Sequence, residues 1–140
     1  MSATAAQIAQ VRRMVNESDD DTYDDDAITV YIESYPSIDE RGEIPWTWDT
    51  LTEPPTKDPN ENWLPTYDLN AAAADVWTEK AGIVAVDFDF DADGGRYTRS
   101  QVYEQYMKQA RHYRARRKMG TTRLHMYPKE SDVLDEDLSN

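Results

Sequence analysis

The aspartates that alternate through the run DFDFDADG are the residues whose type and spacing point most directly to chemistry. Asp89, Asp91, Asp93 and Gly94 match the first, third, fifth and sixth positions of a calcium-binding loop, where carboxylates surround the ion and glycine makes the sharp turn. The twelfth position is Ser100, whereas such a loop needs a bidentate glutamate there. We therefore keep Asp89, Asp91 and Asp93 as a weak metal candidate and favour a plain acidic turn.

No pattern in the chain indicates catalysis. His112 and His125 have no second histidine or cysteine at ligand spacing, and the chain contains no cysteine at all. The absence of cysteine excludes disulfides, thiolate metal sites and cysteine nucleophiles. There is also no paired nucleophile and base, no glycine loop for phosphate and no dinucleotide fingerprint. We expect a protein that is not an enzyme and holds no cofactor.

Charge is distributed very unevenly along the 140 residues, although the formal net charge is −13. Residues 1–95 contain 5 basic and 22 acidic residues, while 96–129 contain 10 basic residues and one acid. Residues 130–140 add five acids and no base. This asymmetry predicts a basic surface on an acidic protein, which can pair with copies of the same chain or with a charged partner.

The basic residues cluster in the last predicted helix and leave two interpretations. They could contact the phosphates of a nucleic acid, which would make residues 108–123 a nucleic-acid-binding module. They could instead meet the acidic part of an adjacent subunit, which we favour because the chain holds 28 acids and arginine suits bidentate interface pairs. The predicted subunit-interface residues of this cluster are Arg111, Arg114, Arg116, Arg117 and Lys118.

Hydrophobic periodicity predicts the elements that must position this cluster. Helical spacing indicates helices over residues 3–16, 24–35, 68–81 and 99–119, with Gly82 ending the third. Alternation from Val84 to Phe90, followed by an Asp-Gly-Gly turn, predicts a short β-hairpin near 84–98. The predicted fold is mostly α: a small bundle of about four helices with that hairpin, a long loop and an extended C-terminal tail.

The long loop spans residues 36–67 and has an unusual composition. It holds six of the seven prolines and three of the four tryptophans. Loops this long inside a compact domain tend to be functional, and tryptophans are enriched at interfaces. We expect the loop to wrap its own domain or to touch a neighbour, and we assign Trp46, Trp48 and Trp63 to the subunit interface.

The C-terminal residues divide into a strand-like segment and an acidic end. Residues 121–127 alternate weakly and carry strand formers, but no obvious partner strand exists in the chain. We divide the chain into a helical domain at 1–120, with the loop 36–67 inserted, and an extended tail at 121–140. No run approaches the roughly 20 apolar residues of a membrane helix, and the N-terminus lacks a signal-peptide pattern. We expect no membrane association and synthesis in the cytoplasm.

Two segments resemble the head–tail connector proteins of long-tailed double-stranded DNA phages, also called adaptor or head-completion proteins. One is WLPTYDLNAAAADVWTEKA, residues 63–81, which resembles their central helix. The other runs from Asp87 to Tyr103 and continues as YMKQARHYRARR. The resemblance covers residues 1–120 and is a pattern over several segments. This sequence departs from the family in its long loop at 36–67. Family loops vary here, so the resemblance assigns that loop no partner.

The resemblance implies a structural role. Family members form a helical bundle that assembles as a twelve-subunit ring, docks under the portal protein and passes the genome toward the tail, without enzymatic activity. Further partners would be a tail-side stopper or tail-terminator protein and the genomic DNA, which passes through the channel without sequence-specific binding. The location would be the head–tail interface of the virion, after assembly in the host cytoplasm. Family C-terminal segments add a strand to the portal, so the implied portal interface is Thr121, Thr122, Arg123, Leu124, His125, Met126 and Tyr127.

Overall fold

The computed structural model describes residues 2–88 and 95–119 of the chain. Within them lie four helices: α1 (Ala5–Val15), α2 (Asp25–Glu33), α3 (Leu69–Phe88) and α4 (Gly95–Ala115). One antiparallel pair of strands, β1 (Trp46–Asp49) and β2 (Thr56–Pro59), forms between α2 and α3. The mostly α class and the helical bundle predicted from the sequence are therefore confirmed.

Local chemistry sets the ends of the first two helices. Thr4 and Gln7 form a capping box at the start of α1, and Asn16 ends that helix in the left-handed conformation. The Asp24 side chain accepts from the backbone N–H of Ala27 at the start of α2, and two further aspartates occupy the first turn. The aspartate run 24–26 thus has a structural use in starting a helix.

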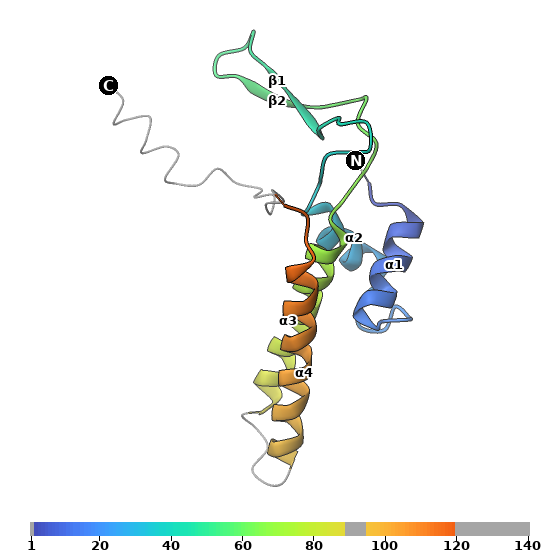
Figure 1. Ribbon diagram of the computed structural model, residues 1–140, viewed down its shortest axis with the longest axis vertical. Coiled ribbons are helices and arrows are strands. Elements are labelled where there is room, and N and C mark those ends of the chain that lie inside the picture. Colours follow the sequence, from blue (N-terminus) through green and yellow to red (C-terminus); the bar gives the residue numbers. More distant parts are fainter. Residues whose placement is uncertain (1, 89–94, 120–140) are drawn as a thin grey trace, which may run out of the picture.

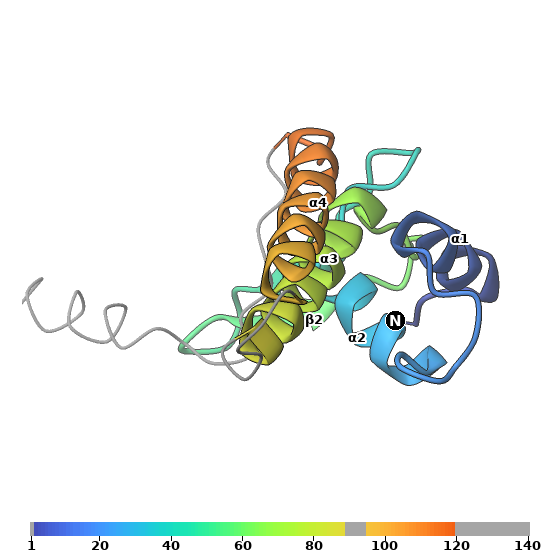
Figure 2. The same ribbon diagram turned by 90° about the horizontal axis from the view of Figure 1, so that it is seen from below.

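Helix α3 is the central element of the bundle. It runs side by side with α4 in Figure 1, and Figure 2 shows α4 on one side of α3 with α1 and α2 on another. Ala72 and Ala73 are fully buried, which lets neighbouring helices approach α3 closely. Two bonds fix α1 against it: Trp77 donates its indole N–H to the Met14 carbonyl, and Lys80 donates to the Val15 carbonyl.

The core is formed by apolar side chains of all four helices and of the segment that leads into α3. Its buried members include Val11, Val15, Ile28, Ile32, Tyr35, Trp63, Tyr67, Ala71, Ala72, Ala73, Val76, Trp77 and Ala110. Tyr106 and Tyr113 of α4 are half-buried against this cluster. Burial of aliphatic and aromatic side chains at roughly 25 cal/mol per Å² is the main stabilising contribution.

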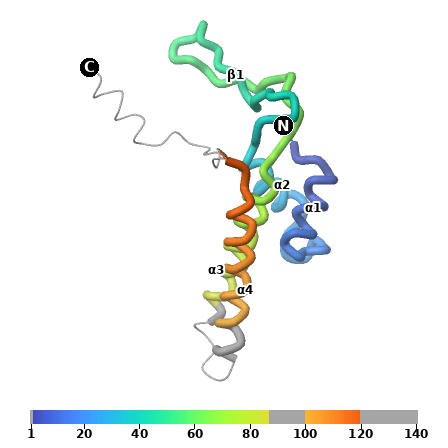
Figure 3. Tube along the Cα trace, viewed as in Figure 1, coloured from blue at the N-terminus to red at the C-terminus, as the bar shows by residue number. Residues whose placement is uncertain are grey.

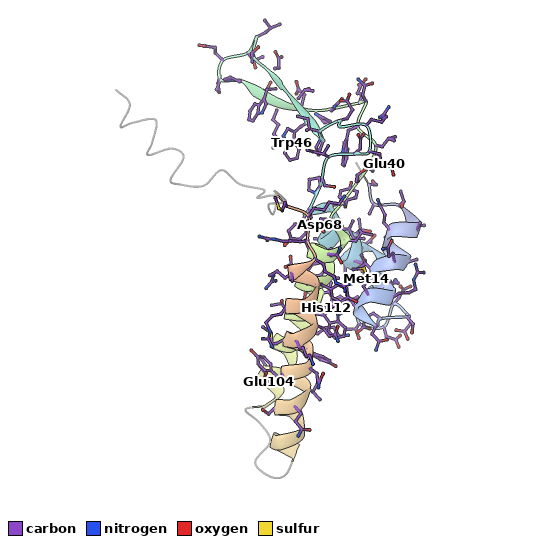
Figure 4. The ribbon with its side chains drawn as sticks, in the orientation of Figure 1. Met14, Glu40, Trp46, Asp68, Glu104 and His112 are labelled. Atoms are coloured by element: carbon purple, nitrogen blue, oxygen red, sulfur yellow. The ribbon has the colours of Figure 1, made fainter. Side chains whose placement is uncertain are left out.

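Asp68 joins the ends of three helices and is 1% exposed. Its carboxylate accepts from the backbone N–H of Ala71 (3.3 Å) in α3 and from that of Lys118 (2.7 Å), just beyond α4. Its own N–H donates to the carbonyl of Tyr35, which follows α2. Figure 4 shows Asp68 at the junction between the helices and the strands.

The hairpin predicted near 84–98 is wrong. Residues 84–88 continue α3, and residues 95–98 form the first turn of α4. A few alternating apolar residues do not distinguish a strand from a buried helix, and a helix already nucleated in the alanine run extends at little cost. For the same reason Gly82 does not end α3, which passes through it.

Two parts of the predicted organisation lie outside the described residues. Asp89, Asp91 and Asp93 belong to residues 89–94, and the tail at 121–140 lies beyond Met119. The metal candidate and the boundary between 1–120 and 121–140 therefore stay predictions.

Replacing Asp68 by alanine should lower the free energy of unfolding by about 1–3 kcal/mol, because the N–H groups of Ala71 and Lys118 would lose a buried acceptor. Denaturant titration measures this change. Asp58→Ala removes an exposed carboxylate from β2 and should leave stability nearly unchanged. Equal effects of the two changes would contradict the role given to Asp68.

Candidate interaction surface

The strands form a projecting arm, which we define as residues 44–60. Figure 3 shows the arm extending away from the helices, and no helix approaches either strand closely. Trp46 pairs with Pro59, and Trp48 pairs with Lys57. Because side chains alternate between faces, these four share one face, while Thr47, Asp49, Thr56 and Asp58 share the other. The arm thus has an aromatic face and an acidic face.

A lysine sits between the two tryptophans of the aromatic face. The Lys57 Nζ lies 3.2 Å from the Trp46 ring centroid and 5.9 Å from that of Trp48. An ammonium over indole is attracted by the ring quadrupole. Burial by the surrounding rings lowers the pKa of Lys57. Trp48 is nevertheless 60% exposed, so the outer part of this face is open to a partner.

Asp39 organises the base of the arm. Its carboxylate accepts from the backbone N–H groups of Arg41, Glu43 and Leu64, and the Arg41 side chain pairs with it. The Leu64 N–H contributes most to holding the pKa of Asp39 below its usual range. One buried carboxylate thereby joins the two chain segments that flank the arm.

A cleft of about 310 Å³ separates the aromatic face from the helical body. Trp46, Lys57 and Pro59 line one wall, while Pro36 and Tyr67 line the other. The Tyr67 hydroxyl is buried and has no hydrogen-bond partner among the described residues. Its burial, together with a nearby glutamate, raises the pKa of Tyr67 to about 12.

The basic end of α4, defined as Arg111, Arg114, Arg116, Arg117 and Lys118, lies beside the base of the arm. Lys118 reaches Asp68 through its N–H and Ser37 through its Nζ (3.3 Å). The residues next to these two, Tyr67 and Pro36, line the cleft with Trp46. The structure therefore brings the predicted arginines and the arm tryptophans to one end of the molecule.

The members of the basic end differ in their pairing. Arg114 contacts Asp75 (3.4 Å) and the Thr78 hydroxyl (3.4 Å) of α3. Arg111, Arg116 and Arg117 are exposed, and their side chains form no ion pair or hydrogen bond with the described part of the chain. These three cations are available to a partner.

An acidic loop, defined as residues 16–26, lies on the other side of α3. Arg12 pairs there with Asp20 (2.5 Å) and Asp25 (2.7 Å). Asp21 and Asp26 are exposed and have no cationic partner among the described residues. The basic end and the acidic loop thus face different directions from one central helix, as Figure 2 shows for α4 and α1–α2.

Trp63 corrects one expectation from the sequence. It was assigned to the subunit interface, but it is only 5% exposed and packs edge-on against Tyr67. Its indole N–H donates to the Ser37 carbonyl. A side chain so enclosed belongs to the core, whereas Trp46 and Trp48 remain at least partly accessible.

Sequence reasoning missed the arm itself and the part played by Lys57. The sequence contained a signal for a strand in Trp46-Thr-Trp48, where aromatic and polar residues alternate. Pro54 and Pro55 follow, before a second extended run. A two-residue alternation is short, and the prolines pointed to irregular structure instead.

Comparisons of the chain with protein-family models, with curated proteins and with solved structures found no match. In the described ranges 2–88 and 95–119, no helix has the length and apolar character needed to cross a bilayer. The same residues contain no group of three or more histidine and carboxylate side chains placed to hold a metal ion. The portal segment predicted at 121–127 lies outside these ranges.

Replacing Tyr23 and Tyr67 together by phenylalanine should remove a loss of stability at alkaline pH. Burial raises the pKa of each to about 12, so the unfolded chain, with pKa near 10, releases these protons first. Stability should fall as pH rises from about 10 toward 12, by roughly 1 kcal/mol per tyrosine at about pH 11. Denaturant titration of both proteins across this range measures the difference, and parallel curves would contradict it.

Proposed function

We propose that this protein is a structural, non-enzymatic adaptor of the head–tail connector of a tailed phage. Copies associate through unlike sides into a ring, and the ring docks on the portal protein and conducts the genome to the tail. The family resemblance of residues 1–120 suggests the connector role and the copy number of twelve. The observation that carries the ring is the placement of the basic end and the acidic loop on different sides of α3.

Unlike sides favour a ring for a geometric reason. A contact between two different surfaces repeats from copy to copy, and it closes when the rotation per copy divides a full turn. Arg111, Arg116 and Arg117 supply cations on one side and Asp21 and Asp26 supply anions on the other, and none of these five pairs with an opposite charge in the described part of the chain. Such complementarity sets the direction of assembly and disfavours contacts between like sides.

The surplus of acid suits a conduit for DNA. The chain carries a formal net charge of −13, so pairing the basic end with a neighbour leaves the ring strongly negative. A negative wall repels the phosphate backbone and lets a duplex slide without being held. The arm and the basic end lie at the same end of the molecule. The ring would therefore present the exposed Trp48 and the basic end on one face, toward the portal or a tail-side protein.

A nucleic-acid-binding module is the second candidate, and one observation favours it. Arg111, Arg116 and Arg117 have no partner in the described part of their own chain. Free arginines on a helix can contact phosphates. The two proposals differ in what binds these arginines: the acidic loop of another copy, or the phosphates of a duplex.

Reversing two charges at the basic end should separate the copies. Arg116→Glu with Arg117→Glu replaces attraction to the acidic loop by repulsion, at a cost of about 1–2 kcal/mol per interface. Native mass spectrometry at low salt should show a ring for the unchanged protein and smaller species for the variant. Adding Asp21→Lys and Asp26→Lys to the variant should restore the ring.

Glu104→Lys is the matched control, because Glu104 is exposed on α4 and belongs neither to the basic end nor to the acidic loop. It should leave the mass unchanged. A monomeric protein at low salt, or a ring insensitive to the double reversal, would contradict the proposal. Salt-dependent duplex binding that the double reversal abolishes in a monomer would favour the nucleic-acid module instead.

A further inference from the structure

Among the described residues, no strand pairs with the outer edge of β1. The Asn60 N–H donates to the Pro45 carbonyl (3.0 Å). This bond shows which residues of the antiparallel pair form hydrogen bonds across the two strands and which do not. Because that pattern alternates, Thr47 and Asp49 direct their backbone groups to β2, whereas Trp46 and Trp48 direct theirs outward. No helix approaches this edge, so it can accept a further strand.

The opposite edge of the arm is unsuited to pairing. The outward-facing residues of β2 are Lys57 and Pro59, and Pro59 has no N–H to donate. Pro55 lies just before the strand. Prolines commonly protect an edge in this way, whereas an open edge that binds nothing invites aggregation. Only the β1 edge is therefore built to receive a strand.

Residues 121–127 match both faces of the arm. In an extended segment Leu124 and Met126 share one face, and Arg123 and His125 share the other. Pairing along β1 can place the apolar pair beside Trp46 and Trp48 and the basic pair beside Asp49. A shift by one residue would exchange these faces, so the pattern also selects the register.

The described part of the chain ends beside the base of the arm. Lys118 bonds to Asp68 and Ser37, whose neighbours line the same cleft as Trp46. The segment 121–127 is longer than the four residues of β1, so it can pair along the whole strand. Residues 119 and 120 link it to Lys118. A short tether also gives an effective concentration in the millimolar range.

We propose that residues 121–127 pair along the free edge of β1 in the same chain and turn the arm into a three-stranded sheet. The pairing satisfies the outward N–H and C=O groups of Trp46 and Trp48, and it covers Trp48 with apolar side chains. The inference does not depend on the ring. It implies that a partner offering a better edge, such as the portal of the proposed function, would obtain the segment by strand exchange.

Hydrogen exchange of backbone amides tests this pairing in the full-length monomer, at a salt concentration where no larger species is present. Exchange at Trp46 and Trp48 should be slower, by roughly tenfold or more, in the unchanged protein than in Leu124→Pro with Met126→Pro. Proline cannot donate to the ladder, so the variant should release the edge. Thr47 and Asp49, which face β2, should stay protected in both proteins.

Leu134→Pro is the matched control, because it changes the acidic end of the tail beyond the segment and should leave exchange at Trp46 and Trp48 unaltered. Fast exchange at both tryptophans in the unchanged protein would overturn the proposal, as would protection that survives in the double-proline variant. Protection that disappears on dilution would assign the strand to a second copy and would overturn pairing within one chain.

Discussion

The buried carboxylate of Asp68 is the contact on which the arrangement of the surfaces depends. The carboxylate caps α3 and accepts a hydrogen bond from the backbone N–H of Lys118, just beyond α4. The backbone N–H of Asp68 itself donates to the carbonyl of Tyr35, which follows α2. An unpaired carboxylate in that place would be costly, so the three chain segments must meet there. The meeting point fixes the basic end of α4 beside the base of the arm.

Helix α3 gives the molecule two distinct sides, because different helices pack on each side of it. Its small buried residues let α4 approach from one side while Trp77 and Lys80 hold α1 on another. The acidic loop and the basic end are thereby kept apart, and Arg12 neutralises only part of the loop. Among the described residues, cations of the basic end and anions of the acidic loop have no partner, and these charges are the physical basis for the proposed assembly with other copies.

The helices could be predicted from the sequence because their apolar residues recur at helical spacing and their caps are chemically explicit, as Asp24 and Asp68 show. The arm could not be predicted from the sequence, because β2 is exposed along its length. The contact that stabilises the two strands is a lysine over a tryptophan ring rather than an apolar stripe. The alternation of apolar residues after Val84 wrongly predicted a strand, because helix α3 continues through Gly82 and includes these residues. Residue type alone placed Trp63 at an interface, whereas burial and an indole hydrogen bond place it in the core.

Electron microscopy of the full-length protein mixed with the portal protein that the proposed function requires tests the central claim most directly. The account predicts a ring stacked on the portal, in which the basic end of each copy faces the acidic loop of the next. A portal that binds no ring, or a ring in which like sides of neighbouring copies meet, would contradict it.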